Sequence, residues 1–296
     1  MKTSMIYKFR RKCQYIAYSI IPAEVLSKLY CRIVIGYKPN LEEPKTLNEK
    51  LQWLKLNFYP FNSDVIMCAD KYTVRSYVEA KGFGDFLNDL YNVWDDVNEI
   101  NWEQLPEQFV MKCTHGCGYN IICDSKEILD SDEAKKKIRK WMNEDFGRFN
   151  VEPHYNKTKH RIICEKYLGE DIVDYKFFCL NGEVKFMYIA QGFGKGINER
   201  MTFFDENGNI APFQRDDYKQ NETAVLPDQF EEMKRMSKIL SKYFPFVRVD
   251  WFEVEGRVYF GELTFTPGGC MMNFSPKEYD FKLGQLLEIH EYIKSF

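Results

Sequence analysis

The sequence predicts a mixed α and β protein that forms one compact domain or two to three interlocked subdomains. Its 296 residues are enough to bury a substantial core. In the first half, short apolar runs typical of strands alternate with segments of helical periodicity, and in the second half Asn-Gly pairs separate runs of strand-forming residues. This alternation of strands and helices indicates mixed α and β structure.

The first predicted helix begins at the capping box TLNE, which starts at Thr46 and precedes apolar residues at helical spacing. A second helix is expected to begin at Asp70 and Lys71, and Gly82 is well placed to end it. Two short strands, 109–111 and 121–123, then flank the loop THGCGY. A further helix is marked by Ala134, Ile138, Trp141 and Met142.

Strands dominate from residue 161 onward. The run 162–165 is followed by 175–180 and 183–190, which Asn181 and Gly182 join with the strongest short signal for a hairpin. A second Asn-Gly pair, at 207–208, follows the run 201–204.

The last part of the chain combines helices and one more strand pair. Asp228 with Glu231 resembles a capping box and predicts a helix before the last strand pair, 246–253 and 257–263. A closing helix is expected to carry Leu283, Leu286, Leu287 and Ile293.

Composition narrows the functional classes. The chain is 45% hydrophobic and 29% charged, and 41 Lys and Arg against 44 Asp and Glu give a net charge of −3, so no basic field favours nucleic acid as the main partner. Nine cysteines without a CxxC pair or a secretory signal indicate reduced thiols and a cytoplasmic protein. A zinc site is an alternative reading of one local cluster, although its spacing matches none of the usual patterns: Cys113, His115, Cys117 and Cys123.

The first 36 residues mix basic side chains with apolar stretches at 16–21 and 25–29. No apolar run approaches the roughly 18 to 20 residues that span a bilayer, so a transmembrane anchor is not expected. Two alternatives stay open for this segment. It contacts the anionic inner face of a membrane, or it packs onto the protein's own core.

Several segments place charged groups on or beside apolar strands. A charge in such a place needs an ion-pair or hydrogen-bond partner, or it serves a function. Lys112 precedes the glycine loop and suits phosphate oxygens, or it extends over a tight turn into solvent. Glu165 ends an apolar strand before an extended KYL segment that suits the edge of a purine, or that belongs to a surface hairpin. Lys176 lies within an aromatic strand and faces either a cleft or solvent.

The strand pair near the C-terminus carries the most specific pattern. Arg248 and Asp250 share one face of the first strand, and Glu262 and Thr264 share one face of the second. If these faces coincide, the carboxylates suit Mg²⁺. The alternative is a surface hairpin with cross-strand ion pairs.

Strand register decides between these alternatives. If the pair turns through the two residues 255–256 without a break, Asp250 lies opposite Gly261, Val249 lies opposite Glu262, and the two carboxylates point to opposite faces. A metal site therefore requires a three-residue connection or a bulge, for which Gly256 or Gly261 can supply a residue with positive φ.

The order of these segments resembles the ATP-grasp superfamily. The segments are ADKYTVR, VMKCTHGCG, EKYL, VRVD and GELTFTP, and more narrowly TLNEKLQWLKL, LPEQFVMKCTHGCGYNIIC and GELTFTPGG resemble the TupA-like, teichuronopeptide-biosynthesis group. The resemblance implies an α+β fold in which two α+β subdomains clasp ATP between antiparallel sheets, with a helical N-terminal region. The expected divisions are 1–43, 44–108, 109–168 with the glycine loop, and 169–296 with the metal site.

The resemblance also implies roles for individual residues. Lysines and the glycine loop would hold the ATP phosphates. The EKYL segment, called the hinge below, would contact adenine through Glu165 and the backbone of 166–168. Asp174, or failing that Asp171, would bind the ribose. The implied cofactor-binding residues are Lys71, Lys112, His115, Gly116, Gly118, Glu165, Lys166, Tyr167, Leu168 and Asp174.

For the metal and the chemistry, the resemblance points to the last strand pair. Asp250, Glu262 and Thr264 would bind Mg²⁺, with Thr264 standing where the family usually has asparagine and Asn273 as a substitute ligand. Arg248 and Lys176 would stabilise the transferred phosphoryl group.

The implied activity is that of a carboxylate-amine ligase acting through an acyl phosphate. It would join an amine, most simply an amino acid, to a sugar-acid carboxylate in cell-surface polysaccharide or capsule biosynthesis, and release ADP and phosphate. Two alternatives stay open. One is an ATP-dependent phosphotransferase on a glycan hydroxyl, and the other is a non-catalytic nucleotide-binding scaffold.

Overall fold

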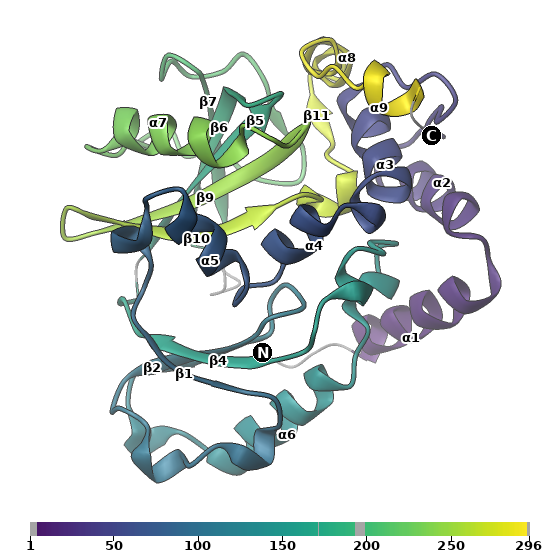
Figure 1. Ribbon diagram of the computed structural model, residues 1–296. Coiled ribbons are helices and arrows are strands. Elements are labelled where there is room, and N and C mark those ends of the chain that lie inside the picture. The colour runs from purple at the N-terminus through teal and green to yellow at the C-terminus, as the bar shows by residue number, and fades with distance from the viewer. Residues whose placement is uncertain (1–4, 171, 193–198, 295–296) are drawn as a thin grey trace.

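Two antiparallel sheets form the upper and lower parts of the molecule in Figure 1, a computed structural model that describes residues 5–170, 172–192 and 199–294. The lower sheet has four strands in the order β1-β4-β2-β3 and the upper sheet has five in the order β10-β9-β5-β6-β7. Strand bounds in the lower sheet are β1 Leu90–Trp94, β2 Phe109–Cys113, β3 Asn120–Cys123 and β4 Ile162–Lys166. Those in the upper sheet are β5 Val173–Leu180, β6 Glu183–Gln191, β7 Arg200–Asp205, β9 Phe246–Val254 and β10 Arg257–Thr264. Two further strands, β8 Gln214–Arg215 and β11 Phe274–Ser275, pair with each other.

Helix α7 (Phe230–Ser241) covers an apolar face of the upper sheet. The rings of Phe177 and Phe230 stack at 5.9 Å, and Trp251 donates a hydrogen bond to Ser237 at 2.8 Å. Because side chains alternate along a strand, the residues on either side of Trp251 in β9 point to the opposite face. That opposite face carries the charged residues of the candidate site.

The lower sheet has its own core, formed with helix α6 (Ser131–Met142). Strand β2 alternates buried and half-buried residues, and Phe109 and Met111 point into this core with Ile138 of α6. The hairpin β2–β3 carries the glycine loop between its strands, as predicted.

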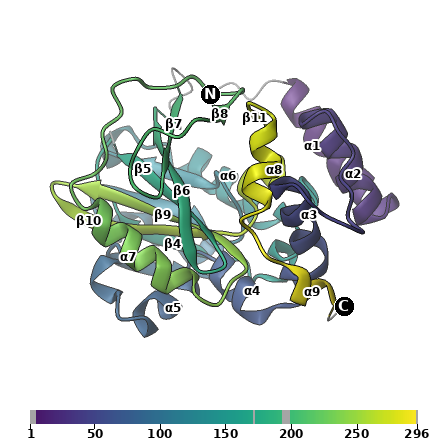
Figure 2. The same ribbon diagram turned by 90° about the horizontal axis from the view of Figure 1, so that it is seen from above.

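Helices from both ends of the chain gather at one edge of the molecule, where α1 lies beside the lower part (Figures 1 and 2). They are α1 Met5–Ile20, α2 Ala23–Val34, α3 Leu47–Asn57, α8 Glu278–Gly284 and α9 His290–Lys294. The predicted capping box is confirmed, because Thr46 and Glu49 bond each other's backbone at the start of α3. Gly284 of α8 allows the close approach of α3, since a Cβ there would lie 2.3 Å from the Lys45 carbonyl oxygen.

Three local predictions were wrong. The helix expected from Asp70 begins at Val74 as α5 (Val74–Ala80), after α4 (Ser63–Ala69), because the Asp70 carboxylate accepts bonds from the next N–H groups and holds a turn instead. No capping box forms at Asp228, since α7 follows Gln229 without a side-chain cap. The closing helix divides into α8 and α9.

Within the described residues, none of the helices combines the length and the apolar character needed to cross a membrane.

Candidate active site

A bulge at Gly261 sets the register of the β9–β10 hairpin. The turn uses Glu255 and Gly256, both with positive φ, and pairing is regular as far as Phe260 opposite Trp251. The register then shifts by one residue, so that Glu262 lies opposite Asp250. A Cβ at Gly261 would lie 2.9 Å from the Asp250 carbonyl oxygen, which explains the glycine at this position. The bulge is therefore the break that the metal hypothesis requires, although Gly261 provides space rather than positive φ.

The bulge brings five polar side chains together on one face. Arg248 donates to both oxygens of Asp250, at 2.6 Å from Nε and 2.5 Å from Nη2, and Lys176 Nζ lies 2.7 Å from Asp250 Oδ2. Arg248 Nη2 also lies 3.3 Å from Glu262 Oε1 and 3.0 Å from Thr264 Oγ1. Thr264 in turn donates to Glu262 at 2.7 Å. This group is called the charged cluster below.

The charged cluster keeps Glu262, Lys176 and Arg248 ionised. Burial raises the pKa of Glu262, but the positive charges of Lys71, Arg248 and Lys176 outweigh burial and hold this pKa well below its ordinary value. Burial lowers the pKa of Lys176, but the facing carboxylates outweigh it and raise this pKa above its ordinary value. Arg248 behaves in the same way beside Asp250. The cluster thus holds opposite charges at close range, ready to exchange partners with an incoming polyanion.

Lys71 links the charged cluster to the glycine loop. Its Nζ lies 3.6 Å from Glu262 Oε2 and donates to the Gly116 carbonyl oxygen at 2.8 Å. The loop is tight, because a Cβ at Gly116 would lie 2.8 Å from the Tyr119 ring, and Gly118 has a φ of 74°. Lys71 therefore sits where the loop meets the cleft.

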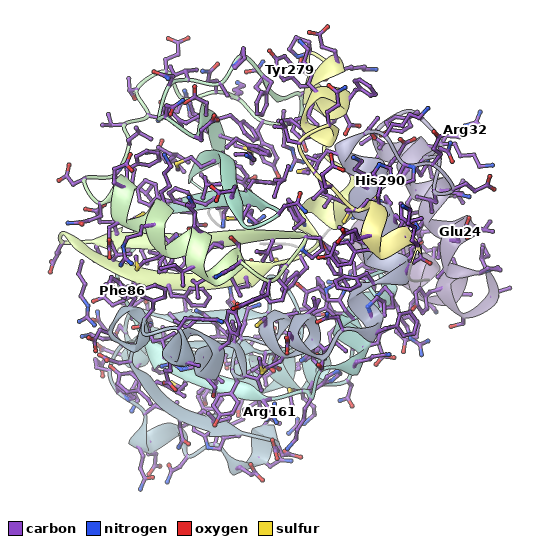
Figure 3. The ribbon with its side chains drawn as sticks, turned by 45° about the horizontal axis from the view of Figure 1, so that its top comes forward. Glu24, Arg32, Phe86, Arg161, Tyr279 and His290 are labelled. Atoms are coloured by element: carbon purple, nitrogen blue, oxygen red, sulfur yellow. The ribbon has the colours of Figure 1, made fainter. Side chains whose placement is uncertain are left out.

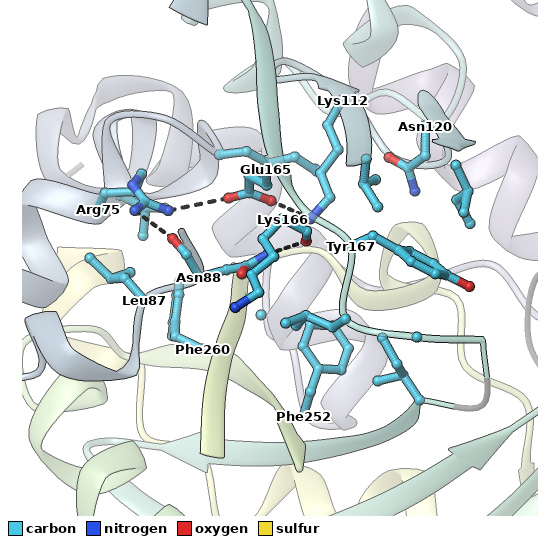
Figure 4. A pocket seen from close by; sticks show the side chains of 18 residues that line it. Arg75, Leu87, Asn88, Lys112, Asn120, Glu165, Lys166, Tyr167, Phe252 and Phe260 are labelled. Atoms are coloured by element: carbon cyan, nitrogen blue, oxygen red, sulfur yellow. Dashed lines mark hydrogen bonds and ion pairs between the residues drawn. The ribbon is translucent and has the colours of Figure 1, made fainter. Parts of the chain in front are cut away.

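A cavity of about 200 Å³ lies between the sheets beside the predicted hinge (Figure 4). Glu165 is buried in its wall and bonds two cations, Lys112 at 2.7 Å and Arg75 at 3.2 Å. Phe252 and Phe260 form an apolar wall. A largely apolar cavity with a few polar groups suits an aromatic base.

The hinge leaves the sheet at the edge of this cavity. The backbone of Lys166 is already bonded, since its N–H donates to Asp89 at 2.9 Å and its carbonyl accepts from Asn88 at 2.8 Å. Tyr167 and Leu168 follow the end of β4 and line the cavity. Within the described part of the chain, the Leu168 N–H has no hydrogen-bond partner. Leu168 is therefore better placed than Lys166 to bond a base edge.

Asp174 lies on the cleft face of β5 but apart from the cavity lining. It is opposite Phe252 in the sheet, and its Oδ2 lies 3.3 Å from Lys176 Nζ. Its other oxygen is buried without a partner among the described residues, and burial raises its pKa. Asp171, the alternative ribose-binding residue, lies outside the described residues.

The structure does not bring the His115 side chain into this group. The ring is fully buried against α6, bonds the Trp141 carbonyl at 3.0 Å and stacks on His160 at 3.6 Å. The metal alternative for the neighbouring cysteines gains no support, because the described residues contain no group of three His, Cys, Asp or Glu able to hold a metal ion. Only the backbone of His115 remains a candidate for contact with phosphate.

A second cavity, of about 310 Å³, adjoins the other side of the charged cluster. Arg248, Glu262 and Thr264 form its inner end, and Cys117 of the glycine loop lines it. The cavity is also lined by Phe146, Phe149, Glu152, Tyr155, Arg10 and Arg11. This is called the acceptor cavity below. The charged cluster thus separates two cavities of different composition.

Sequence reasoning missed four of these positions. Arg75 closes the quoted segment ADKYTVR, yet only the fold shows that it reaches Glu165. Arg10 and Arg11 of α1 were assigned to a basic N-terminus, and no local signal marks Glu152, which is buried, bonds Thr266 and has a pKa that burial raises.

Several solved structures resemble this one weakly. D-Alanine–D-alanine ligase from Bacillus anthracis is 16% identical, with 77% of this chain and 69% of that chain covered and a TM-score of 0.47. The corresponding enzyme from Helicobacter pylori is 16% identical, with 82% and 69% covered and a TM-score of 0.44. L-Amino acid ligase from Bacillus licheniformis is 13% identical, with 76% and 48% covered and a TM-score of 0.44, so this chain spans about half its length.

No curated protein sequence matches this chain. The family model described as TupA-like ATPgrasp matches residues 49–288, which is most of the chain. This range includes the charged cluster and, apart from residues on α1, the lining of both cavities. The chain therefore belongs to the TupA-like ATP-grasp family, which confirms the fold and the cofactor ATP predicted from its motifs.

Proposed function

We propose that this protein is an ATP- and Mg²⁺-dependent carboxylate-amine ligase that joins an amine, such as an amino acid, to a sugar-acid carboxylate in cell-surface polysaccharide biosynthesis. The observation that carries the proposal is the position of the charged cluster between two cavities. Lys71 lines the first cavity, and its Nζ lies 3.6 Å from Glu262, which lines the second. A phosphoryl group held at this junction is within reach of a substrate in the acceptor cavity.

In this proposal the first cavity binds the nucleotide. Adenine lies against Phe252 and bonds the Leu168 backbone, while Lys71 and Lys112 hold the phosphates under the glycine loop. Asp174 keeps its proposed role at the ribose, supported by its place on the same face as Phe252. Lysine suits this task because it carries a compact, mobile charge.

The donor set fits one Mg²⁺ ion. Glu262 is ionised, about a third of its side chain is exposed, and it lies opposite Asp250. Mg²⁺ is usually held by one or two carboxylates together with substrate phosphates, so Glu262 and Asp250 suffice. Thr264 is less suited as a ligand, because its hydroxyl bonds both Glu262 and Arg248. When bound, the ion would neutralise charge on the β- and γ-phosphates.

Polyanion binding would rearrange the pairs within the charged cluster. Both oxygens of Asp250 are now bonded by Arg248 and Lys176. Triphosphate oxygens compete for the same cations, so Arg248 and Lys176 would turn towards them and release the carboxylates. The two cations then stabilise the phosphoryl group in transfer.

The reaction balances in two steps. A carboxylate oxygen of the sugar acid attacks the γ-phosphorus, the bond to the bridging oxygen breaks, and ADP leaves. The amine nitrogen then attacks the acyl carbon, phosphate leaves with the bonding electrons, and the nitrogen loses a proton to solvent. Enclosure by the glycine loop protects the acyl phosphate from water.

The acceptor cavity supports a sugar-acid substrate. Phe146, Phe149 and Tyr155 offer aromatic surface for a sugar ring, and Arg248 lies at the end where the reacting carboxylate must be. Arg10 and Arg11 add positive charge at the far end. This arrangement favours an acceptor with a second anionic group, such as a phosphate that links the sugar to a carrier.

The deciding experiment is mass spectrometry of products after incubation with ATP, Mg²⁺, uronic-acid glycans and pooled amino acids. An amide product with ADP and phosphate supports the ligase. A stable phosphorylated glycan formed without an amine identifies a phosphotransferase. Nucleotide binding without turnover across the panel identifies a scaffold.

A double variant tests the acceptor cavity separately. Arg10→Gln with Arg11→Gln should raise the KM for a phosphorylated uronic acid about tenfold or more and leave the KM for ATP unchanged. Equal effects on both substrates would remove these arginines from acceptor binding. Lys12→Gln, on the exposed side of α1, is the matched control.

The location that we propose is cytoplasmic, at the inner face of the membrane. The basic N-terminal segment supports this location.

A further inference from the structure

Helix α1 contacts the rest of the protein through polar and aromatic side chains. Tyr15 donates to Asp145 at 3.1 Å, and the Arg11 guanidinium lies 3.6 Å from the centre of the Phe149 ring. Arg148 donates to Ser19 at 3.1 Å. Arg11, Tyr15 and Ser19 are spaced four residues apart, so they mark one face of the helix. This face holds α1 in place.

A second face of α1, about 110° around the helix from the first, is apolar, and its side chains are half-exposed or more in the described protein. At about 100° per residue, its four residues Met5, Phe9, Ile16 and Ile20 fall within an arc of about 60°. Helix α2 carries a similar row of Val25, Leu29 and Ile33. These seven side chains, called the N-terminal apolar surface, are between 46% and 86% exposed.

Of the two alternatives for the apolar stretches, packing onto the protein's own core holds only in part, because this surface is exposed. Only the other sides of the helices do so, as Leu26 and Cys31 of α2 show. Contiguous exposed apolar rows on two neighbouring helices indicate an interaction surface. Both views of the molecule place α1 and α2 together at one edge (Figures 1 and 2).

Charge distinguishes between the occupants of this surface. Residues 1–36 contain seven Lys and Arg and one acidic residue, Glu24, whereas the remaining 260 residues contain 34 Lys and Arg and 43 Asp and Glu. Figure 3 shows Arg32 and Glu24 at the outer edge of the molecule. A second copy docked face to face would bring like charges together, whereas an anionic lipid surface complements them.

We propose that α1 and α2 form an interfacial membrane-binding surface that lies on an anionic bilayer. The apolar rows enter the boundary between headgroups and acyl chains, while the exposed Lys12 and Arg32 contact anionic headgroups. This binding is independent of the ligase reaction. It would hold the mouth of the acceptor cavity beside the bilayer, since Arg10 and Arg11 of α1 line that cavity.

Vesicle co-sedimentation of the full chain tests the proposal. Vesicles of equal parts phosphatidylglycerol and phosphatidylcholine should bind the protein, and vesicles of phosphatidylcholine alone should bind it at least about tenfold more weakly. Binding should fall when salt is raised from about 0.05 M to about 0.5 M, because the headgroup contacts are screened. Failure to bind anionic vesicles at low salt would overturn the proposal.

Matched variants locate the binding surface. Ile16→Ser, Ile20→Ser and Ile33→Ser together should reduce vesicle binding by about tenfold or more, because serine loses the apolar transfer of isoleucine. Lys12→Gln with Arg32→Gln should have a similar effect at low salt only. The control combines equally exposed apolar residues elsewhere, as Ile128→Ser, Ile210→Ser and Val225→Ser.

Two results contradict the proposal directly. In one, the control variant loses as much vesicle binding as the Ile16, Ile20 and Ile33 variant. In the other, light scattering finds a dimer that the same variant converts to a monomer, which assigns the surface to a second copy. All variants should keep the wild-type unfolding midpoint, since every substituted side chain is exposed.

Discussion

Lys112→Ala tests the nucleotide site most directly. Lys112 lines the first cavity, and its ammonium lies 2.7 Å from one oxygen of Glu165, whose other oxygen lies 3.2 Å from Arg75. Two functions are compatible with this geometry. Lys112 binds a phosphate itself, or it only neutralises Glu165 so that the hinge accepts a polyanion.

The magnitudes separate these functions from a general loss of structure. A hydrogen bond to a charged group contributes about 1.5 to 3 kcal/mol, so loss of a phosphate contact should raise the Kd for ATP roughly 10- to 150-fold. Glu165 is only 8% exposed and keeps Arg75 as a partner, so the free energy of unfolding should fall by about 1 to 3 kcal/mol. A domain of this size tolerates that loss.

The assay is calorimetric titration with ATP for three proteins, namely Lys112→Ala, Glu165→Gln and the double variant. If Lys112 contacts phosphate, the double variant binds as weakly as Lys112→Ala. If Lys112 only neutralises Glu165, removal of the carboxylate restores affinity in the double variant. Near-wild-type affinity in either the single lysine variant or the double variant would refute direct phosphate binding.

Three further outcomes are expected. Glu262→Gln should abolish turnover and leave the fold intact, which activity and circular dichroism measure together; residual turnover above a few per cent would contradict its role at Mg²⁺. Gly261→Ala should lower the free energy of unfolding by about 1 to 3 kcal/mol and reduce turnover, because the new Cβ would lie 2.9 Å from the Asp250 carbonyl oxygen. An unchanged urea midpoint would show that the bulge adapts. Acidification should destabilise the protein, because burial lowers the pKa of His115 to about 4 and that of His154 to about 3, from 6.5. Below about pH 6.5 the two histidines gain protons in the unfolded chain but stay neutral in the folded one. Their contribution to stability is therefore complete above that pH, and by pH 5 each histidine should have lowered the free energy of unfolding by about 2 kcal/mol. Equal denaturant midpoints at pH 7.5 and 5 would contradict this.

Local patterns were sufficient for elements that depend on neighbouring residues. The capping box at Thr46 formed, and the Asn181-Gly182 pair turned a hairpin with both residues at positive φ, because these features need only a few consecutive residues. Local patterns failed where side chains compete for the backbone. Asp70 bonds the N–H groups of Tyr72 and Thr73 and delays the helix to Val74.

Packing removed one candidate from the site and added others. His115 was grouped with the glycine loop because it lies within it, yet its ring turns inward to stack on His160, 45 residues away. Arg75 and the α1 arginines entered the site from segments far apart in sequence. Contacts of this kind depend on how helices settle on sheets, which periodicity does not encode.

The sequence by itself determined the family, through the order of its motifs, and the pairing of Arg248 with Asp250 and of Glu262 with Thr264 on strand faces, because side-chain alternation is a property of any strand. It left open whether the two faces coincide. Tertiary structure decided that at Gly261, where the absence of a side chain lets the backbone bulge and moves Glu262 to the face of Asp250. A shift of one residue in the pairing of β9 with β10 therefore determines whether the two carboxylates lie on the same face. Packing between the strands sets this register, rather than either strand alone.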